Sequence, residues 1–143
     1  MKKLTAILFL ITLILVIFVF ALNYPFDKIK TEDNNGERVL RVIDGDTFEL
    51  YNGNKVRLIC VDAPELGSKG GEESKEFLAE MIEGREIRLE KDSSETDRYG
   101  RLLRYAYVED VFVNKELVRQ GYASVFRYGN DTRRCDEIDG SMN

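Results

Sequence analysis

Hydrophobic residues follow two different patterns along this chain. Residues 4–22 form an almost continuous apolar run in which Thr5 and Thr12 are the only polar residues. As a helix this run would be roughly 28 Å long, which is close to the thickness of a bilayer's hydrocarbon core. A buried core helix would show an apolar stripe, whereas this run is apolar on all sides. The pattern therefore predicts a membrane-directed helix within residues 1–22, followed by a polar stalk over residues 23–36.

Two interpretations of residues 1–22 remain open. The length of the apolar run favours an uncleaved signal anchor, while Ala21 ends a small-residue spacing that suits cleavage of a signal peptide. Lys2 and Lys3 precede the run, so the N-terminus is expected to stay inside the cell. We therefore expect a domain that lies outside the membrane and is anchored to it, or that is secreted if the segment is cleaved.

The rest of the chain alternates short apolar runs with turn signals. Asn52-Gly53 is a strong hairpin signal, and helical spacing over residues 72–83 and 113–120 ends in each case at a glycine, Gly84 or Gly121. Strands are predicted at residues 37–44, 46–51, 55–62, 85–91 and 101–109. Five short strands with a helix after the third predict a mainly β fold with helices, closed as a five-stranded barrel of the OB type.

Composition limits the function of this domain. The chain has 143 residues with 21 basic and 26 acidic side chains, no histidine, and a net charge of −5. Lys2 and Lys3 are the only charges before residue 23, so the exported part is more acidic still. It lacks the basic surface usual in nucleic-acid-binding proteins, so a polyanion would have to be held by local arginines and a metal ion.

Two cysteines, Cys60 and Cys135, leave two possibilities open. An exported domain favours a disulfide, and the alternative is a pair of separate thiols. Two cysteines without histidine disfavour a zinc site.

Acidic residues at two predicted strand ends suggest a metal site. Asp46 follows the tight turn Asp44-Gly45, and Asp62 ends the third strand. Two carboxylates and a nearby carbonyl, such as that of Ala63, form the hard oxygen environment that Ca²⁺ prefers. Considered alone, the segment Asp44-Gly45-Asp46 is simply a turn.

Three further residues complete a set suited to phosphodiester hydrolysis. Glu65 follows Pro64 and is a candidate to accept a proton from an attacking water molecule. Arg57 and Arg101 each carry a planar guanidinium that can hold two phosphate oxygens. Each residue alone has an ordinary interpretation as a surface or loop residue, but together they indicate a nuclease that works without histidine.

These fragments, in this order, resemble the staphylococcal nuclease (thermonuclease) family. The resemblance runs from about residue 37 to residue 123 and is carried by VIDGDT at 42–47, VRL at 56–58, VDAPE at 61–65, TDRYGRLLRY at 96–105 and VNKELVRQGYA at 113–123. It implies a five-stranded OB barrel and calcium-dependent hydrolysis of DNA and RNA with little sequence specificity, leaving 3′-phosphates. The implied partners are single-stranded or loosely paired nucleic acids, and the implied state is a monomer.

The resemblance also implies a role for each site residue. The metal ligands would be the carboxylates of Asp46 and Asp62 and the carbonyl of Ala63, which replaces the family's threonine. Glu65 would be the general base. The groups that contact substrate would be Arg57 and Arg101 at the scissile phosphate, Tyr99 at a nucleotide phosphate and Tyr128 against a base.

The C-terminal end departs from the family pattern. The nuclease-like domain is predicted over residues 37–128, and residues 129–143 form a short tail where the family usually has a packed helix. One alternative is therefore a truncated, unstable product, and a separate alternative is a non-catalytic module that binds nucleic acid or protein. The second alternative is disfavoured because such modules typically lose the carboxylates that this chain keeps.

Overall fold

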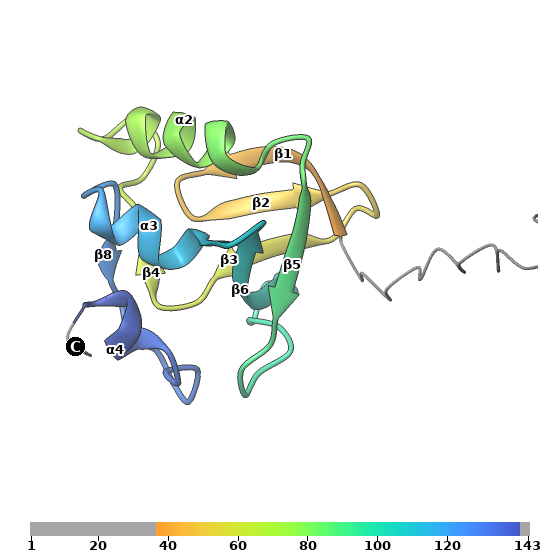
Figure 1. The fold of residues 1–143 in the computed structure, drawn as a ribbon, viewed down its shortest axis with the longest axis vertical. Coiled ribbons are helices and arrows are strands. Elements are labelled where there is room, and N and C mark those ends of the chain that lie inside the picture. Colours follow the sequence, from red (N-terminus) through yellow and green to blue (C-terminus); the bar gives the residue numbers. More distant parts are fainter. Residues whose placement is uncertain (1–36, 141–143) are drawn as a thin grey trace, which may run out of the picture. The chain divides into compact units, whose positions relative to one another are not determined.

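The computed structural model describes residues 37–140 (Figure 1). The predicted membrane helix and stalk lie outside these residues. Within the described part, no helix is long and apolar enough to cross a membrane. The elements in chain order are β1 (Glu37–Asp44), β2 (Thr47–Leu50), β3 (Lys55–Leu58), β4 (Val61–Asp62), α2 (Gly71–Ile82), β5 (Glu86–Glu90), β6 (Leu102–Val108), β7 (Val111–Phe112), α3 (Val113–Arg119), β8 (Ser124–Val125) and α4 (Cys135–Ile138).

Five of the strands close into a barrel, as the sequence predicts. Their neighbour order is β3-β2-β1-β5-β6, and β3 then pairs with β6 to complete the circle. The closing pair is parallel, whereas the other four pairs are antiparallel. The long strand β1 pairs with both β2 and β5, and register shifts in its pairing with β2 bend it around the barrel. Closure removes the exposed strand edges that an open sheet would present.

The predicted third strand is wrong in one respect. Residues 55–62 form two strands, β3 and β4, separated by a turn at Ile59 and Cys60, where Cys60 has φ 60°. β4 leaves the barrel and pairs instead with β8. The side chain of Asn114 fixes the turn, since its Nδ2 donates to Ile59 O (2.8 Å) and its Oδ1 accepts from Ala106 N (2.9 Å). A continuous apolar run hides this break, because the strand residues Val56, Leu58 and Val61 are buried in one core while the turn residues Ile59 and Cys60 are buried in a second.

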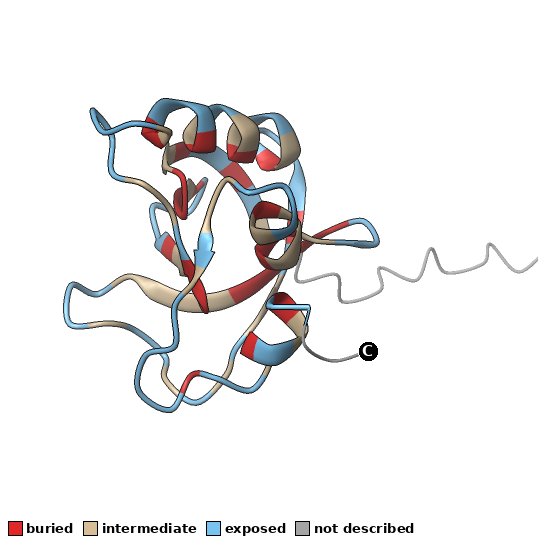
Figure 2. Cartoon of the chain, turned by 90° about the vertical axis from the view of Figure 1, so that its left-hand side faces the viewer, coloured by how far each residue is buried: buried red, intermediate tan, exposed pale blue. Residues whose placement is uncertain are grey.

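The main core fills the barrel and extends under two helices. Leu78 and Ile82 of α2 are four residues apart and fully buried, and Val113 and Leu117 of α3 repeat this spacing. Figure 2 shows the buried positions of both helices. The strands contribute Val39, Val42, Phe48, Leu50, Val56, Leu58, Val61, Ile87, Ala106 and Val108.

A second, smaller core lies at the C-terminal end of the domain. It contains Ile59, Tyr105 and Ile138 together with Cys60 and Cys135, which form a disulfide. The structure therefore resolves the open question about the cysteines in favour of a bond. The short C-terminal segment is packed, because Cys135 and Ile138 of the one-turn helix α4 are 0 % and 2 % exposed.

Candidate active site

The turn between β1 and β2 is built to place Asp46. Asp44 Oδ1 accepts a hydrogen bond from Asp46 N (3.1 Å). A Cβ at Gly45 would lie 2.5 Å from Ala63 Cβ and 2.7 Å from Ser74 Cβ, so only glycine fits between the turn, the chain after β4 and helix α2. This close approach brings Ala63 N to 3.0 Å from Asp46 Oδ2, to which it donates.

The Asp46 carboxylate is buried among polar groups. Its residue is 7 % exposed, and Thr47 Oγ1 donates to its Oδ1 (2.9 Å). Burial raises the pKa of Asp46 to about 6, although the nearby Arg57 guanidinium and the Ala63 amide favour the charged form. Asp46 is therefore a carboxylate whose negative charge is only partly compensated by its surroundings.

Arg57 joins the two predicted metal ligands. Its Nη2 lies 3.0 Å from Asp46 Oδ2 and 3.3 Å from Asp62 Oδ1, so these two carboxylate oxygens share one nitrogen and lie close together. Its Nη1 donates to Leu58 O (2.9 Å) and Val61 O (2.6 Å). These two carbonyl groups lie on either side of the break between β3 and β4. The structure thus brings Asp46, Arg57, Asp62 and the Ala63 backbone into one group.

Arg101 approaches this group from the start of β6. Its Nε donates to Asp97 Oδ2 (2.7 Å), and its Nη1 lies 3.4 Å from Thr47 Oγ1, the hydroxyl that also contacts Asp46. Asp97 Oδ1 accepts from Tyr99 N and Arg101 N. Partial burial raises the pKa of Asp97, but the hydrogen bonds from Arg101 and Tyr99 outweigh it, and the net shift is downward.

Thr47 and Asp97 are site residues that the sequence analysis did not single out. Asp97 could have been recognised, because Asp at the first position and Gly100 at the fourth are typical of a tight turn. The role of Thr47 has no comparable signal, since it depends on β2 and β6 both pairing with β3, which brings Arg101 to Thr47.

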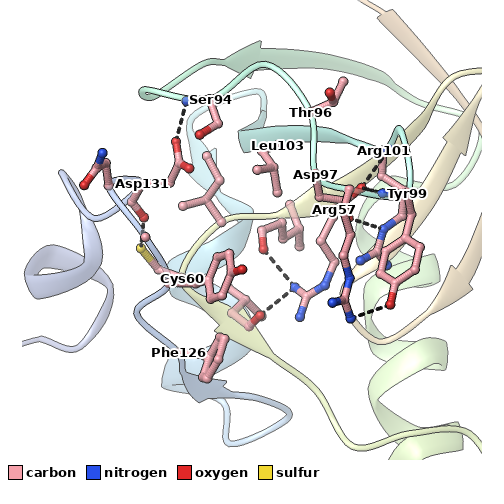
Figure 3. A pocket seen from close by; sticks show the side chains of 17 residues that line it. Arg57, Cys60, Ser94, Thr96, Asp97, Tyr99, Arg101, Leu103, Phe126 and Asp131 are labelled. Carbon is pink, nitrogen blue, oxygen red and sulfur yellow. Dashed lines mark hydrogen bonds and ion pairs between the residues drawn. The ribbon is translucent and has the colours of Figure 1, made fainter.

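Arg57, Arg101, Tyr99 and Tyr128 line one pocket of about 600 Å³ (Figure 3). Tyr99 is 68 % exposed, and the Arg98 guanidinium lies 4.7 Å from its ring. Tyr128 is 72 % exposed and stacks on Phe126, with ring centroids 6.3 Å apart. Two arginines and exposed aromatic rings therefore face one concave surface.

Glu65 stands apart from the other predicted residues. Its side chain is exposed and makes no hydrogen bond or ion pair within the described residues. Its backbone is fixed, since Ser68 N and Ser68 Oγ donate to Glu65 O, and a Cβ at Gly71 would lie 2.2 Å from that oxygen. The carboxylate is thus carried by an anchored loop just after Asp62, where it is available to water.

The donors at this site suit a hard cation in part. Over residues 37–140 no three or more His, Cys, Asp or Glu side chains gather as a metal cluster. A cation would therefore rest on Asp46 and Asp62, and backbone carbonyl, water and phosphate oxygens would complete its shell. The partly compensated, buried carboxylate of Asp46 fits such an ion, because a positive charge beside it favours its ionised form.

Comparison with known proteins agrees with the fold. Residues 55–140 match the family described as "Staphylococcal nuclease homologue". The chain is 32 % identical to a thermonuclease of Staphylococcus hyicus, over 97 % of this chain and 90 % of that protein. It is 34 % identical to a thermonuclease of Staphylococcus intermedius, over 86 % of this chain and 81 % of that protein. It is 36 % identical to endonuclease YncB of Bacillus subtilis, over 68 % of this chain and 52 % of that protein. The chain belongs to the staphylococcal nuclease family.

Proposed function

We propose that this protein is a nuclease that hydrolyses phosphodiester bonds in DNA, RNA or both, depends on Ca²⁺, has little sequence specificity and leaves 3′-phosphates. The observation that carries the proposal is the convergence of Arg57 and Arg101 on one pocket beside the paired carboxylates of Asp46 and Asp62. The names of the relatives, thermonuclease and endonuclease, support the same reaction class.

Charge compensation is the main task of the site. Asp46, Asp62 and the Ala63 carbonyl would hold Ca²⁺, which supplies positive charge next to the phosphate when it is bound. Arg57 and Arg101 would provide the rest, because guanidinium groups donate hydrogen bonds to phosphate oxygens. For this, Arg57 would exchange some of its present contacts with Asp46, Asp62 and the carbonyls of Leu58 and Val61 for the phosphate. Asp97 and Thr47 orient Arg101 through the contacts at its Nε and Nη1. A compact cationic site of this kind is needed on a domain whose overall charge is negative.

Glu65 is the group we assign to the attacking water. Its exposed carboxylate is free of partners within the described residues, so it can accept the proton that water loses as it attacks phosphorus. Products with 3′-phosphates require that the bond between phosphorus and the 5′-oxygen breaks. The 5′-oxygen then leaves as a hydroxyl group with a proton from solvent water, and Glu65 releases the proton it accepted to solvent.

The aromatic side chains favour unpaired substrates. Tyr99, Phe126 and Tyr128 are 68 %, 50 % and 72 % exposed at the pocket. Bases that are not paired can stack on such rings regardless of their identity, which supports the proposal of low sequence specificity. We therefore propose single-stranded or loosely paired DNA and RNA as substrates.

The N-terminal sequence and the disulfide support a place of action outside the cytoplasm. Residues 4–22 are apolar enough to insert in a membrane, and a disulfide persists best in an oxidising compartment. We propose that the domain acts as a monomer outside the cytoplasmic membrane, either anchored or released by cleavage. There it meets external nucleic acid and spares the genome of its own cell.

The experiment that tests this function compares Glu65→Gln with Glu73→Gln, an exposed control on α2. Turnover of end-labelled single-stranded DNA is measured in saturating Ca²⁺, and the product ends are identified. Loss of a general base should lower kcat by ~10²–10⁴, while the control should keep wild-type turnover and yield 3′-phosphates. Near-normal turnover of Glu65→Gln would remove Glu65 from the mechanism. A wild type that binds DNA without cutting it would favour the alternative of a binding module.

A further inference from the structure

The pocket has two walls that come from different parts of the chain. One wall is the loop between β5 and β6, which carries Tyr99 and Arg101. The other is the segment after β8, which carries Phe126, Tyr128 and Asp131. In Figure 3, Asp131 and Ser94 face each other at the end of the pocket far from Arg57. The distance between the walls decides whether a nucleotide can touch both at once.

Asp131 connects the two walls directly. It is 7 % exposed, and its Oδ1 accepts hydrogen bonds from Ser93 N (2.9 Å) and Ser94 N (2.8 Å). Ser93 Oγ donates a further bond to the same segment, to Asn130 O (3.1 Å). A charged oxygen that accepts from two successive amides is among the stronger contacts a loop can make.

The segment that carries Asp131 is itself held firmly. Four residues further along, Cys135 is bonded to Cys60 in the turn between β3 and β4. Asp92 Oδ2 accepts from Arg133 N (3.0 Å) and from Tyr105 OH (2.7 Å). The segment is thus tied to the barrel on one side and to the start of the β5–β6 loop on the other. Because Asp131 is part of this fixed segment, its hydrogen bonds with Ser93 and Ser94 hold the β5–β6 loop in place.

We infer that Asp131 is a positioning residue for substrate binding, which sets the spacing between the wall of Tyr99 and Arg101 and the wall of Phe126 and Tyr128. The inference rests on the proposed nuclease function, because it concerns how the same pocket takes its nucleic acid. Asp131 makes no contact with Asp46, Arg57 or Asp62 in the described hydrogen bonds and ion pairs. Arg101 is held separately by Asp97 and Thr47, so the loss of Asp131 should weaken substrate binding far more than it slows the chemical step.

The test uses Asp131→Ala and the conservative Asp131→Asn in the oxidised full-length chain, with Glu80→Ala on the exposed face of α2 as control. The asparagine side chain keeps an oxygen that can accept from both amides, so it should restore the contact. For Asp131→Ala, we expect KM for single-stranded DNA in Ca²⁺ to rise roughly tenfold with kcat within about twofold of wild type. Asp131→Asn and the control should stay within about twofold in both constants.

A wild-type KM for Asp131→Ala would overturn the inference. So would an equal rise in KM for Asp131→Ala and Asp131→Asn, because the effect would then follow the charge and not the hydrogen bonds. A general loss of fold is recognised by circular dichroism. It would also overturn the inference, since Asp131 would then be needed for the fold as a whole.

Amide hydrogen exchange gives a second readout that needs no nuclease activity. In Asp131→Ala, the amides of Ser93, Ser94 and Tyr99 should exchange faster than in wild type, and Asp131→Asn should restore their protection. Unchanged exchange at Tyr99 would show that the loop keeps its position without Asp131. If the wild type has no nuclease activity, the proposed function fails, and hydrogen exchange still decides whether Asp131 positions the loop.

Discussion

The raised pKa of Asp46 predicts an unusual dependence of stability on pH. In the unfolded chain this carboxyl group has a pKa of 3.8, whereas burial raises it to about 6 in the folded domain. Because the folded state binds the proton more tightly, the favourable contribution of Asp46 is complete below pH 3.8 and is lost as the pH rises through 6. The change Asp46→Asn removes the titrating group while keeping the size of the side chain.

The size of the effect follows from the two pKa values. The full shift from 3.8 to about 6 corresponds to roughly 3 kcal/mol, at about 1.4 kcal/mol for each unit. Between pH 5 and pH 8 the folded group loses nearly all of its proton, while the unfolded group is already ionised. Wild type should therefore lose about 1.4 kcal/mol of stability relative to Asp46→Asn over this interval.

Urea unfolding in chelator at pH 5 and pH 8 measures this difference. Groups other than Asp46 titrate in both proteins, so they cancel when the two stabilities are subtracted. Asp62→Asn is the matched control, because its carboxylate contacts the same Arg57 nitrogen but is 57 % exposed. The control should change with pH as wild type does. The reasoning is refuted if wild type and Asp46→Asn change in parallel.

Three other perturbations test separate parts of the structure. Reduction of the Cys60–Cys135 bond, which closes a loop with a sequence separation of 75, should lower the free energy of unfolding by on the order of 4 kcal/mol, and an unchanged urea midpoint with dithiothreitol would contradict it. Gly45→Ala places a Cβ 2.5 Å from Ala63 Cβ, so it should lower the melting temperature and weaken Ca²⁺ binding. If calorimetry gives the melting temperature and Ca²⁺ affinity of wild type, the turn is not tightly packed. Arg101→Lys keeps the charge but loses the planar fork, so kcat on single-stranded DNA should fall by at least roughly tenfold, and wild-type kinetics would exclude a two-pronged phosphate contact.

The barrel could be predicted from sequence because its signals are local. Alternating apolar residues, Asn52-Gly53 and the glycines after both helices mark strands, turns and helix ends within a residue or two of their positions in the structure. The predicted residues that share a turn or a strand end, such as Asp46 and Asp62, also come together as expected. Their spacing along the chain and the pairing of the strands are enough to place them.

Features that depend on distant contacts gave no such signal. The break after Leu58 is hidden because Ile59 and Cys60 are as apolar as the strand before them, although they belong to the second core. Asp131 looks like a solvated tail residue in the sequence, yet it is buried against the amides of Ser93 and Ser94. Nothing in its own neighbourhood reveals partners that lie almost forty positions away.

The central claim, a calcium-dependent nuclease site on this barrel, is tested most directly by cleavage of single-stranded DNA by the purified, oxidised protein. The rate is followed first in chelator and then after Ca²⁺ is added in excess. Because Asp46 and Asp62 are the only side chains that we assign to the ion, binding should be weak, and excess metal is needed. We predict no cleavage in chelator and full cleavage once Ca²⁺ is restored. Equal cleavage in chelator and in Ca²⁺ would contradict the assignment of these carboxylates.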